Sequence, residues 1–547
     1  MHAKINVILE VKKMNNKRIL AVGIEAAEPK LIEKWAKEGQ LPNIAKLMET
    51  GTYSRMRSPT EVSSGATWSS INCGVTPGKH GMGFCHRQFL NGTYETRKKR
   101  ADEVNRKPFW ILLDRNGNDI AVMDVPETKT EDLKGTQLVG WGLEYEAWHT
   151  SSTPKNLIYE VLKKYGKHPF KDWYQTKPTK KEKWKDLSKK VIEATRIRNE
   201  IWKEILKRKK YDFSLVAYAE THFAGHLFWH INDPDHPEYD AELEDYVGNP
   251  ILEVCKLCDE AIGEFQKIDP QAIVTVFSNT GMGPNYSGRH FVAPILKKLG
   301  YYYDDSNTGN GLKILKPAAD VYAVERIEKL IGTDTIMFFK KLIPESIWDK
   351  WTRKYLNMGA TWKKSRAFDI PGDNTGTVRI NLKGREPAGL VEPKDYDKIC
   401  DEIADIFIEL KHPDTGEDIV REVIRVPQKY DGDGNQDFPD LLVKWVEGQP
   451  ITKMQSDRVG LIERDHLPDK RTGAHKDFGF FLISGDVIQK QGRFTEQIYN
   501  WDVAPTILYL RGEEIPEDMD GVPKLEIVAE TFKKSHPVKR TAERIGA

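Results

Sequence analysis

Cysteine is scarce in this sequence, which contains only five among 547 residues. An odd number without the spacing of a disulfide framework is typical of proteins from a reducing compartment, so we expect a cytoplasmic protein. Cys255 and Cys258 form a CxxC pair, but no second pair completes the ligand set of a structural zinc site. Because the surrounding segment ILEVCKLCDEAIGEF has helical apolar periodicity, both thiols are predicted to pack in the interior.

Long hydrophobic runs and an excess of charge are also missing. No segment approaches the ~20 apolar residues of a membrane-spanning helix. With 83 Lys and Arg against 82 Asp and Glu, the net charge of +1 creates no field that would attract nucleic acid or an acidic membrane. The lysine-rich segment Lys177 to Lys190 is predicted to be a solvated helix face. We therefore expect a small-molecule substrate as the partner, and neither nucleic acid nor membrane. No pattern indicates an oligomeric state.

The sequence does contain a regular alternation of apolar strands and amphipathic helices. The segments RILAVGIEAAEP, DFSLVAYAET and AIVTVFSNTGMGP each begin as a buried strand and end in a turn or a helix start. This alternation predicts an α/β fold, with a mostly parallel central sheet sandwiched by helices. The turns that follow such strands are where this fold class usually carries its chemistry.

The pattern changes after Pro284. The following residues include a charged helical stretch from Val324 to Leu356, a β-rich segment GTVRINLKGREP and a helix from Asp395 to Lys411, which together predict an inserted α+β cap. The segments PDLLVKW and GFFLISG then read as strands of a resumed core. The predicted organisation is an N-terminal extension (1–17), a first part of the core (18–284), the cap (285–435), a second part of the core (436–525) and a C-terminal tail (526–547).

Seven segments together resemble the alkaline phosphatase superfamily, and most closely its branch of type I phosphodiesterases and nucleotide pyrophosphatases. They occur in the family's order over about residues 18 to 524: LAVGIEAAEPKLIEKWAKEGQLPNIAKL, GATWSSINCGVTPGKHGM, ETHFAGHLFWHINDPDHP, SNTGMGP, TGTVRINLKGREPAGLV, TGAHKDFGFFLISG and WDVAPTILYLRGEEIPEDMDG. The resemblance implies a hydrolase in which two divalent metals flank a Ser or Thr nucleophile. It also implies one metal on an Asp and a His four residues apart plus a distant His, and a second metal on the Asp ending the first strand, the nucleophile and an Asp-His pair.

At the positions of the second metal this sequence departs from the family pattern. Glu25 stands at the first-strand Asp, Ser64 at the nucleophile, and Asn279 and Thr280 at the Asp-His pair. An amide and a hydroxyl are weak ligands, and one carboxylate offsets little of the repulsion between two dications, so a two-metal mechanism is disfavoured. Asn279 and Thr280 are predicted to line the vacated pocket and to bind substrate. Ser64 keeps two possible roles, nucleophile or substrate anchor.

At the positions of the first metal a different ligand set is present. His222 replaces the Asp of the helix pair, whereas His226 and the distant His475 match the family. Two histidines four residues apart lie on one helix face and can share an ion. These three imidazoles predict a mononuclear site for one divalent metal, Zn or Fe/Mn, with Glu25 as a fourth ligand or as a general base.

The predicted function is therefore a mononuclear, metal-dependent hydrolase of a phosphoester or related ester, in which metal-bound water or Ser64 attacks the substrate. Two alternatives stay open. One is a His-rich iron or other redox-metal enzyme that carries out oxidation or lyase chemistry. The other is a catalytically inactive protein that uses the old cleft only for binding. Metal content separates the inactive protein from the enzymes, and metal identity separates the two enzymes.

Overall fold

The structure is a computed structural model. It describes residues 17–83, 88–97, 99, 101–143, 150–170, 178–303, 361–370, 372–464 and 471–543. Almost all of the expected N-terminal extension and the charged helix expected from Val324 to Leu356 lie outside these residues. Among the helices of the described residues, none combines the length and the hydropathy needed to span a bilayer.

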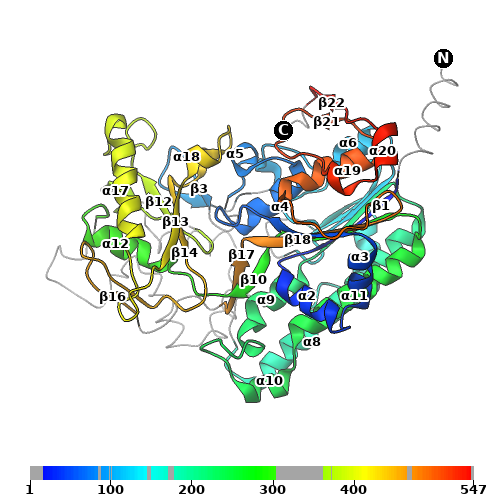
Figure 1. Cartoon of the computed structure of the whole chain (residues 1–547), viewed down its shortest axis with the longest axis horizontal. Helices are drawn as coiled ribbons and strands as arrows, with labels where there is room; N and C mark the ends of the chain where they lie inside the picture. The colour runs from blue at the N-terminus through cyan, green and yellow to red at the C-terminus, as the bar shows by residue number, and fades with distance from the viewer. Residues whose placement is uncertain are drawn as a thin grey trace.

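A ten-stranded sheet forms the centre of the larger body, which we call the core (Figure 1). In spatial order its strands are β19 (Gly492–Arg493), β2 (Thr52–Arg57), β18 (Phe478–Ser484), β9 (Ile273–Ser278), β1 (Ile19–Ile24), β8 (Phe213–Tyr218), β5 (Ile120–Met123), β6 (Thr136–Val139) and β7 (Ser151–Thr153), and β20 (Ile498–Tyr499) pairs with β2. The run from β9 to β6 is parallel, whereas β18 is antiparallel to both of its neighbours. The predicted α/β fold with a mostly parallel sheet is confirmed.

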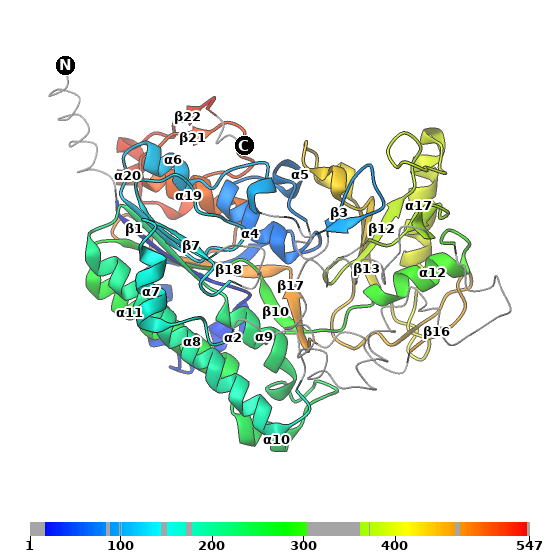
Figure 2. The same ribbon diagram turned by 180° about the vertical axis from the view of Figure 1, so that it is seen from behind.

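Helices cover both faces of this sheet (Figures 1 and 2), which explains why every residue of β1, β8 and β9 is buried. One face carries α2 (Pro29–Lys37), α3 (Pro42–Thr50), α8 (Lys181–Arg208), α9 (Glu220–Phe228) and α11 (Pro250–Ile268); the other carries α4 (Ser64–Cys73), α6 (Trp110–Arg115), α19 (Val503–Leu510) and α20 (Glu530–Ser535). In α11 the buried positions recur at helical spacing and include Cys255 and Cys258, which are free thiols. The predicted packing role of this CxxC pair is confirmed.

A second, smaller sheet forms the centre of the cap. Its strands are, in order, β11 (Ala367–Phe368), β12 (Gly376–Ile380), β14 (Leu441–Trp445) and β13 (Val420–Arg425), and α12 (Val292–Lys298) and α17 (Tyr396–Ile408) pack on it. The expectation that the core resumes at residue 436 is wrong for β14, because this strand pairs with β12 and β13. A short apolar strand reads the same in either sheet, so its sequence does not distinguish the two bodies.

A two-stranded ribbon joins the core to the cap. It consists of β10 (Gly281–Pro284), which leaves β9, and β17 (Gly473–Lys476), which leads into β18. The two bodies also share a small apolar contact in which Val62 and Ala66, beside the start of α4, meet Ile424 and Leu442 of the cap. The ribbon therefore carries its side chains directly beside the edge of the central sheet, where α9 also begins.

Candidate metal site

The carboxyl edge of three neighbouring parallel strands brings the predicted site segments together. The strands β9, β1 and β8 lie side by side, and each is followed at that edge by a segment that the sequence singles out: Asn279, Glu25 and helix α9, respectively. Because β18 runs antiparallel to β9, the ribbon strand β17 that precedes it enters at the same edge. This is the edge at which open α/β sheets place their ligands.

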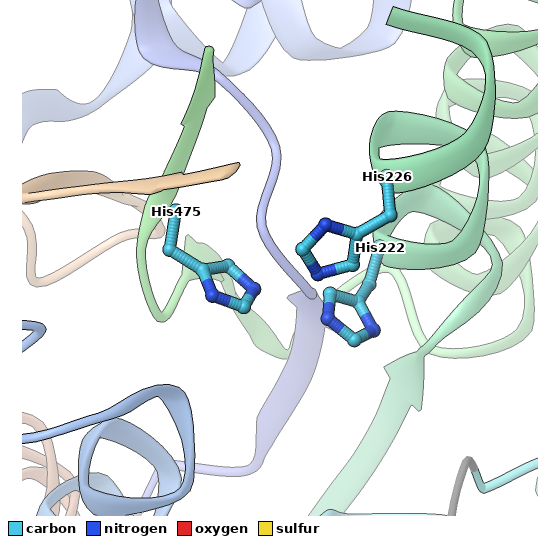
Figure 3. A group of neighbouring side chains, drawn as sticks. All are labelled: His222, His226 and His475. Carbon is cyan, nitrogen blue, oxygen red and sulfur yellow. The ribbon is translucent and has the colours of Figure 1, made fainter. Parts of the chain in front are cut away.

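His222, His226 and His475 converge at this edge. Figure 3 shows the first two on neighbouring turns of α9, with their rings facing that of His475 on β17. The ring centroids lie 4.4 Å apart for His222 and His226, 5.0 Å for His222 and His475, and 4.7 Å for His226 and His475. One ligand nitrogen from each ring lies within 4.8 Å of the other two.

Burial and hydrogen bonds favour metal binding by these rings. Nδ1 of His226 lies 2.7 Å from the Gly473 carbonyl oxygen, and Nδ1 of His475 lies 2.9 Å from Oδ2 of Asp373. In both rings the other nitrogen, Nε2, is buried and makes no hydrogen bond. A buried imidazole nitrogen without a partner is costly unless an ion binds there, and an acceptor on the far side of the ring is the usual partner of a metal-bound histidine. The residues present therefore fit a divalent ion.

The charge states of the neighbouring groups agree with this fit. Burial lowers the pKa of His226 well below its ordinary value, and the neighbouring His222 and Arg471 act in the same direction. The ring is therefore neutral, which is the form that binds a metal. Burial alone would raise the pKa of Asp373, but His475 and Arg471 outweigh it and hold that pKa well below the usual range. An ionised carboxylate thus accepts the proton of His475 Nδ1.

Glu25 and Ser64 lie outside the three-histidine group. Glu25 follows β1, its backbone N–H donates to the Tyr218 carbonyl (3.1 Å), and its own carbonyl accepts from the Thr221 hydroxyl (2.6 Å). These contacts hold Glu25 against the first turn of α9. Its carboxylate is not part of the three-histidine group, so of its two expected roles, fourth ligand and general base, the first has no support from this group. Ser64 is the first residue of α4, which begins after its N-cap Ser63.

Asn279 and Thr280 have internal hydrogen-bond partners instead of an open pocket. Both residues are fully buried. Oδ1 of Asn279 accepts from the Ala26 N–H (3.0 Å), and its Nδ2 donates to Thr67 Oγ1 (2.8 Å). The Thr280 hydroxyl donates to the Lys476 carbonyl. These contacts tie the end of β9 to β1, α4 and β17, so they give no support to the expected role of the two residues in substrate binding.

Replacing Asn279 by aspartate is expected to lower the free energy of unfolding by about 2–3 kcal/mol at neutral pH. The new carboxylate would face Thr67 Oγ1, whose proton is already donated to the Ser64 carbonyl, so one close contact would have no proton. Urea unfolding of both proteins measures the difference. The cost should shrink as the pH falls, because a protonated carboxyl regains a donor; a cost that is independent of pH would contradict this explanation.

Two neighbours of the histidines are not identifiable from the sequence alone. Asp373 lies in the run PGDN, whose Pro, Gly and Asn predict only a turn. The Gly473 carbonyl is a backbone group and leaves no signature in the sequence.

His230, one turn beyond His226, is buried, and its Nδ1 lies 3.0 Å from Thr472 Oγ1. It stays outside the three-histidine group and has a partner of its own.

A comparison with sequence models of known protein families assigns the chain to one family. The sequence model of the type I phosphodiesterase / nucleotide pyrophosphatase family matches residues 19–474. No curated protein sequence matches the chain at a significant level. Similar solved structures include murine ectonucleotide pyrophosphatase/phosphodiesterase 5, an inactive variant in complex with AMP (12% identity, 94% of this chain and 100% of that chain, TM-score 0.47). Others are phosphonoacetate hydrolase from Sinorhizobium meliloti 1021 in complex with phosphonoformate (12%, 90% and 94%, 0.47) and human ectonucleotide pyrophosphatase/phosphodiesterase 5 (12%, 94% and 99%, 0.47).

Proposed function

Because the chain belongs to the type I phosphodiesterase / nucleotide pyrophosphatase family, we propose that it is a metal-dependent phosphoester hydrolase with a mononuclear centre. The family supplies the reaction class. The single observation that carries the mononuclear centre is the convergence of ligand nitrogens from His222, His226 and His475. Three imidazoles are a common ligand set for a catalytic zinc ion, and small side-chain rotations would let these three rings hold one.

The ligand set favours one ion over two. Asn279 and Thr280, at the positions of the second metal, hold their hydrogen bonds to Ala26, Thr67 and Lys476. Neither side chain offers a negative charge, and the three imidazoles are neutral ligands. Two dications a few Å apart would repel each other with too few carboxylates to offset the repulsion. A single Zn²⁺, Fe²⁺ or Mn²⁺ suits the donors that are present.

The chain's own residues have distinct proposed roles around this ion. When bound, the ion polarises a phosphoryl oxygen or lowers the pKa of a water molecule. Glu25 is the proposed general base, because its backbone packs on the first turn of α9 and its position ends the strand beside that helix. Ser64, at the N-terminus of α4, is proposed to hold the substrate or to act as the nucleophile. The substrate is a small phosphoester.

Metal analysis combined with a hydrolysis assay tests this proposal. Protein purified without added metal should contain about one equivalent of a divalent ion per chain. Chelation should abolish the hydrolysis of a p-nitrophenyl phosphodiester, and one of Zn, Mn or Fe(II) should restore it. No turnover of p-nitrophenyl mono- or diesters with any of these ions and with Mg would contradict the hydrolase. Two equivalents per chain would contradict the mononuclear centre.

One observation also favours a second candidate. The group of three imidazoles includes no carboxylate, and imidazole ligands suit Fe(II) as well as Zn(II), although Fe(II) binds more weakly. An iron site with open positions could support oxidation or lyase chemistry. Iron as the native metal, together with hydrolysis that is absent both in air and under nitrogen, would favour this alternative. Zinc as the native metal with oxygen-independent hydrolysis would exclude it.

A further inference from the structure

A loop of the cap reaches into the histidine site. Residues 372–375 lie at the end of the connection between β11 and β12, and two adjacent residues of this loop hold His475. Oδ2 of Asp373 lies 2.9 Å from the His475 ring nitrogen Nδ1, and Nδ2 of Asn374 donates to the His475 carbonyl oxygen (3.0 Å). Only about 2% of the Asp373 and His475 side chains is exposed, so their mutual contact is shielded from water. The loop therefore fixes both the ring and the backbone of one ligand.

Further contacts secure the loop from both sides. The Thr375 hydroxyl donates to the Glu61 carbonyl (2.8 Å), in the core segment that leads into α4. The Ser287 hydroxyl donates to the Asn374 carbonyl, and Arg471 lies 3.4 Å from the second carboxylate oxygen of Asp373. Because each residue of this turn has a partner outside it, the position of the Asp373 carboxylate is determined by the way the cap sits on the core.

We propose that Asp373 is a positioning residue of the metal site: by accepting the Nδ1 proton of His475, it selects the tautomer whose Nε2 lone pair points at His222 and His226. The ligands then all lie on the core and its ribbon, while the group that orients one of them belongs to the cap. This inference rests on the proposed function, because it assigns a role toward the ion of that same site.

The two oriented ligands differ in the strength of their support. His226 donates to a neutral backbone carbonyl, whereas His475 donates to a carboxylate. A charge-assisted hydrogen bond is roughly twice as strong as a neutral one, and it makes the ring a better donor to a metal. Asp373 also places a negative charge one ring away from an ion whose three imidazole ligands are neutral. We therefore expect its removal to weaken ion binding more than the loss of an ordinary contact would.

Zn²⁺ affinity, measured by competition with a chromophoric chelator, tests the proposal without using activity. Asp373→Ala should weaken Zn²⁺ binding by about 10–100-fold. Asp373→Asn, which keeps an acceptor oxygen and loses the charge, should fall between this variant and the parent. Asp369→Asn is the matched control. Asp369 lies in the same connection between β11 and β12, and its buried Oδ1 accepts no hydrogen bond from the described residues. Its affinity should equal that of the parent.

A second readout uses the metal-free protein. The ¹⁵N chemical shifts of the His475 ring should show the Nδ1–H tautomer in the parent and in Asp369→Asn, and a mixture or the other tautomer in Asp373→Ala. Thermal unfolding of each metal-free variant checks that the fold is retained, and the isosteric Asp373→Asn covers the case in which the alanine variant fails to fold.

The outcomes separate this inference from the proposed function. If the parent binds one Zn²⁺ and Asp373→Ala binds it equally well, the positioning role is contradicted, but the proposed metal site is not. A parent that binds no divalent ion would overturn both. Weaker binding in both Asp373 variants, with the control unchanged and the tautomer shifted, would establish the positioning role.

Discussion

Replacing His226 by alanine is expected to reduce the divalent metal bound from about one equivalent per chain to none and to lower phosphodiester hydrolysis at least about 1,000-fold. His226 is central to the group, because its ring lies within 5 Å of both other rings. Without it two imidazoles remain, and two neutral ligands do not hold a divalent ion against water. Elemental analysis of the purified variant measures the first effect, and an initial-rate assay with a p-nitrophenyl phosphodiester measures the second.

His230→Ala is the matched control for this result. His230 has the same side chain, is also buried, and lies one helical turn further along the chain, but its contact is with Thr472. The variant should keep its metal and most of its activity while losing about 2–3 kcal/mol of stability, because it removes that hydrogen bond and the packing of the buried ring on Trp184. A His226→Ala variant that retained a full equivalent of metal would show that the three rings do not form the binding site.

The sequence predicts those parts of the fold in which a segment's own pattern of apolar and polar residues identifies it as a strand or a helix. The strands β1, β8 and β9 are apolar on both faces and alternate with amphipathic helices, and such a pattern leaves few arrangements other than a covered parallel sheet. The boundary of the cap was harder to predict. The strand β14 is equally apolar, and only its pairing with β12 and β13 places it in the cap. Pairing is a long-range property that a local pattern does not contain.

The candidate site shows the same limit. His222, His226 and His475 could be predicted because they stand at the first-metal positions of the family that the sequence resembles, and the first two also share a helical spacing; the topology of the sheet then brings them together. Asp373 could not be predicted. It lies 102 residues before His475 in the sequence, and the two residues meet only because the cap loop packs against the ribbon. The internal role of Asn279 could not be predicted either. Its partners Ala26 and Thr67 lie on other elements, and an amide in a turn reads equally well as a ligand-binding group.

A buried ion cluster beneath α9 makes the second large prediction. Arg198 of α8 lies 2.8 Å from Glu220 and 2.9 Å from Asp124, and all three side chains are fully buried. Glu220 is the first residue of α9, two positions before His222, and it also lies 3.0 Å from His168 Nε2. Burial acts to raise the pKa of Glu220, but Arg198 and His168 outweigh it and lower that pKa below its ordinary value. The guanidinium therefore keeps the start of the metal-binding helix in place.

Arg198→Met is expected to lower the free energy of unfolding by about 3–5 kcal/mol, because it leaves two buried carboxylates without their cation. Urea unfolding of the metal-free proteins measures this loss. The triple variant Arg198→Met, Asp124→Asn, Glu220→Gln removes the charges together and should recover much of the stability. The recovery should be incomplete, because Asp124 accepts from the backbone N–H groups of both Trp141 and Gly142, and an asparagine can accept only one of them well.

The pH dependence provides an independent check on this cluster. Since the pKa of Glu220 is lower in the folded than in the unfolded state, the cluster stabilises the protein above the unfolded pKa and loses this contribution as the pH falls through the folded one. The parent should therefore lose more stability on acidification than the triple variant does. The Zn²⁺ affinity of the folded triple variant then shows whether the charges also position His222 and His226. An affinity equal to that of the parent would mean that a neutral cluster holds the start of α9 equally well. If Arg198→Met lowers the free energy of unfolding by less than about 1 kcal/mol, the stabilising role of Arg198 is contradicted. That result would not bear on the proposed metal site.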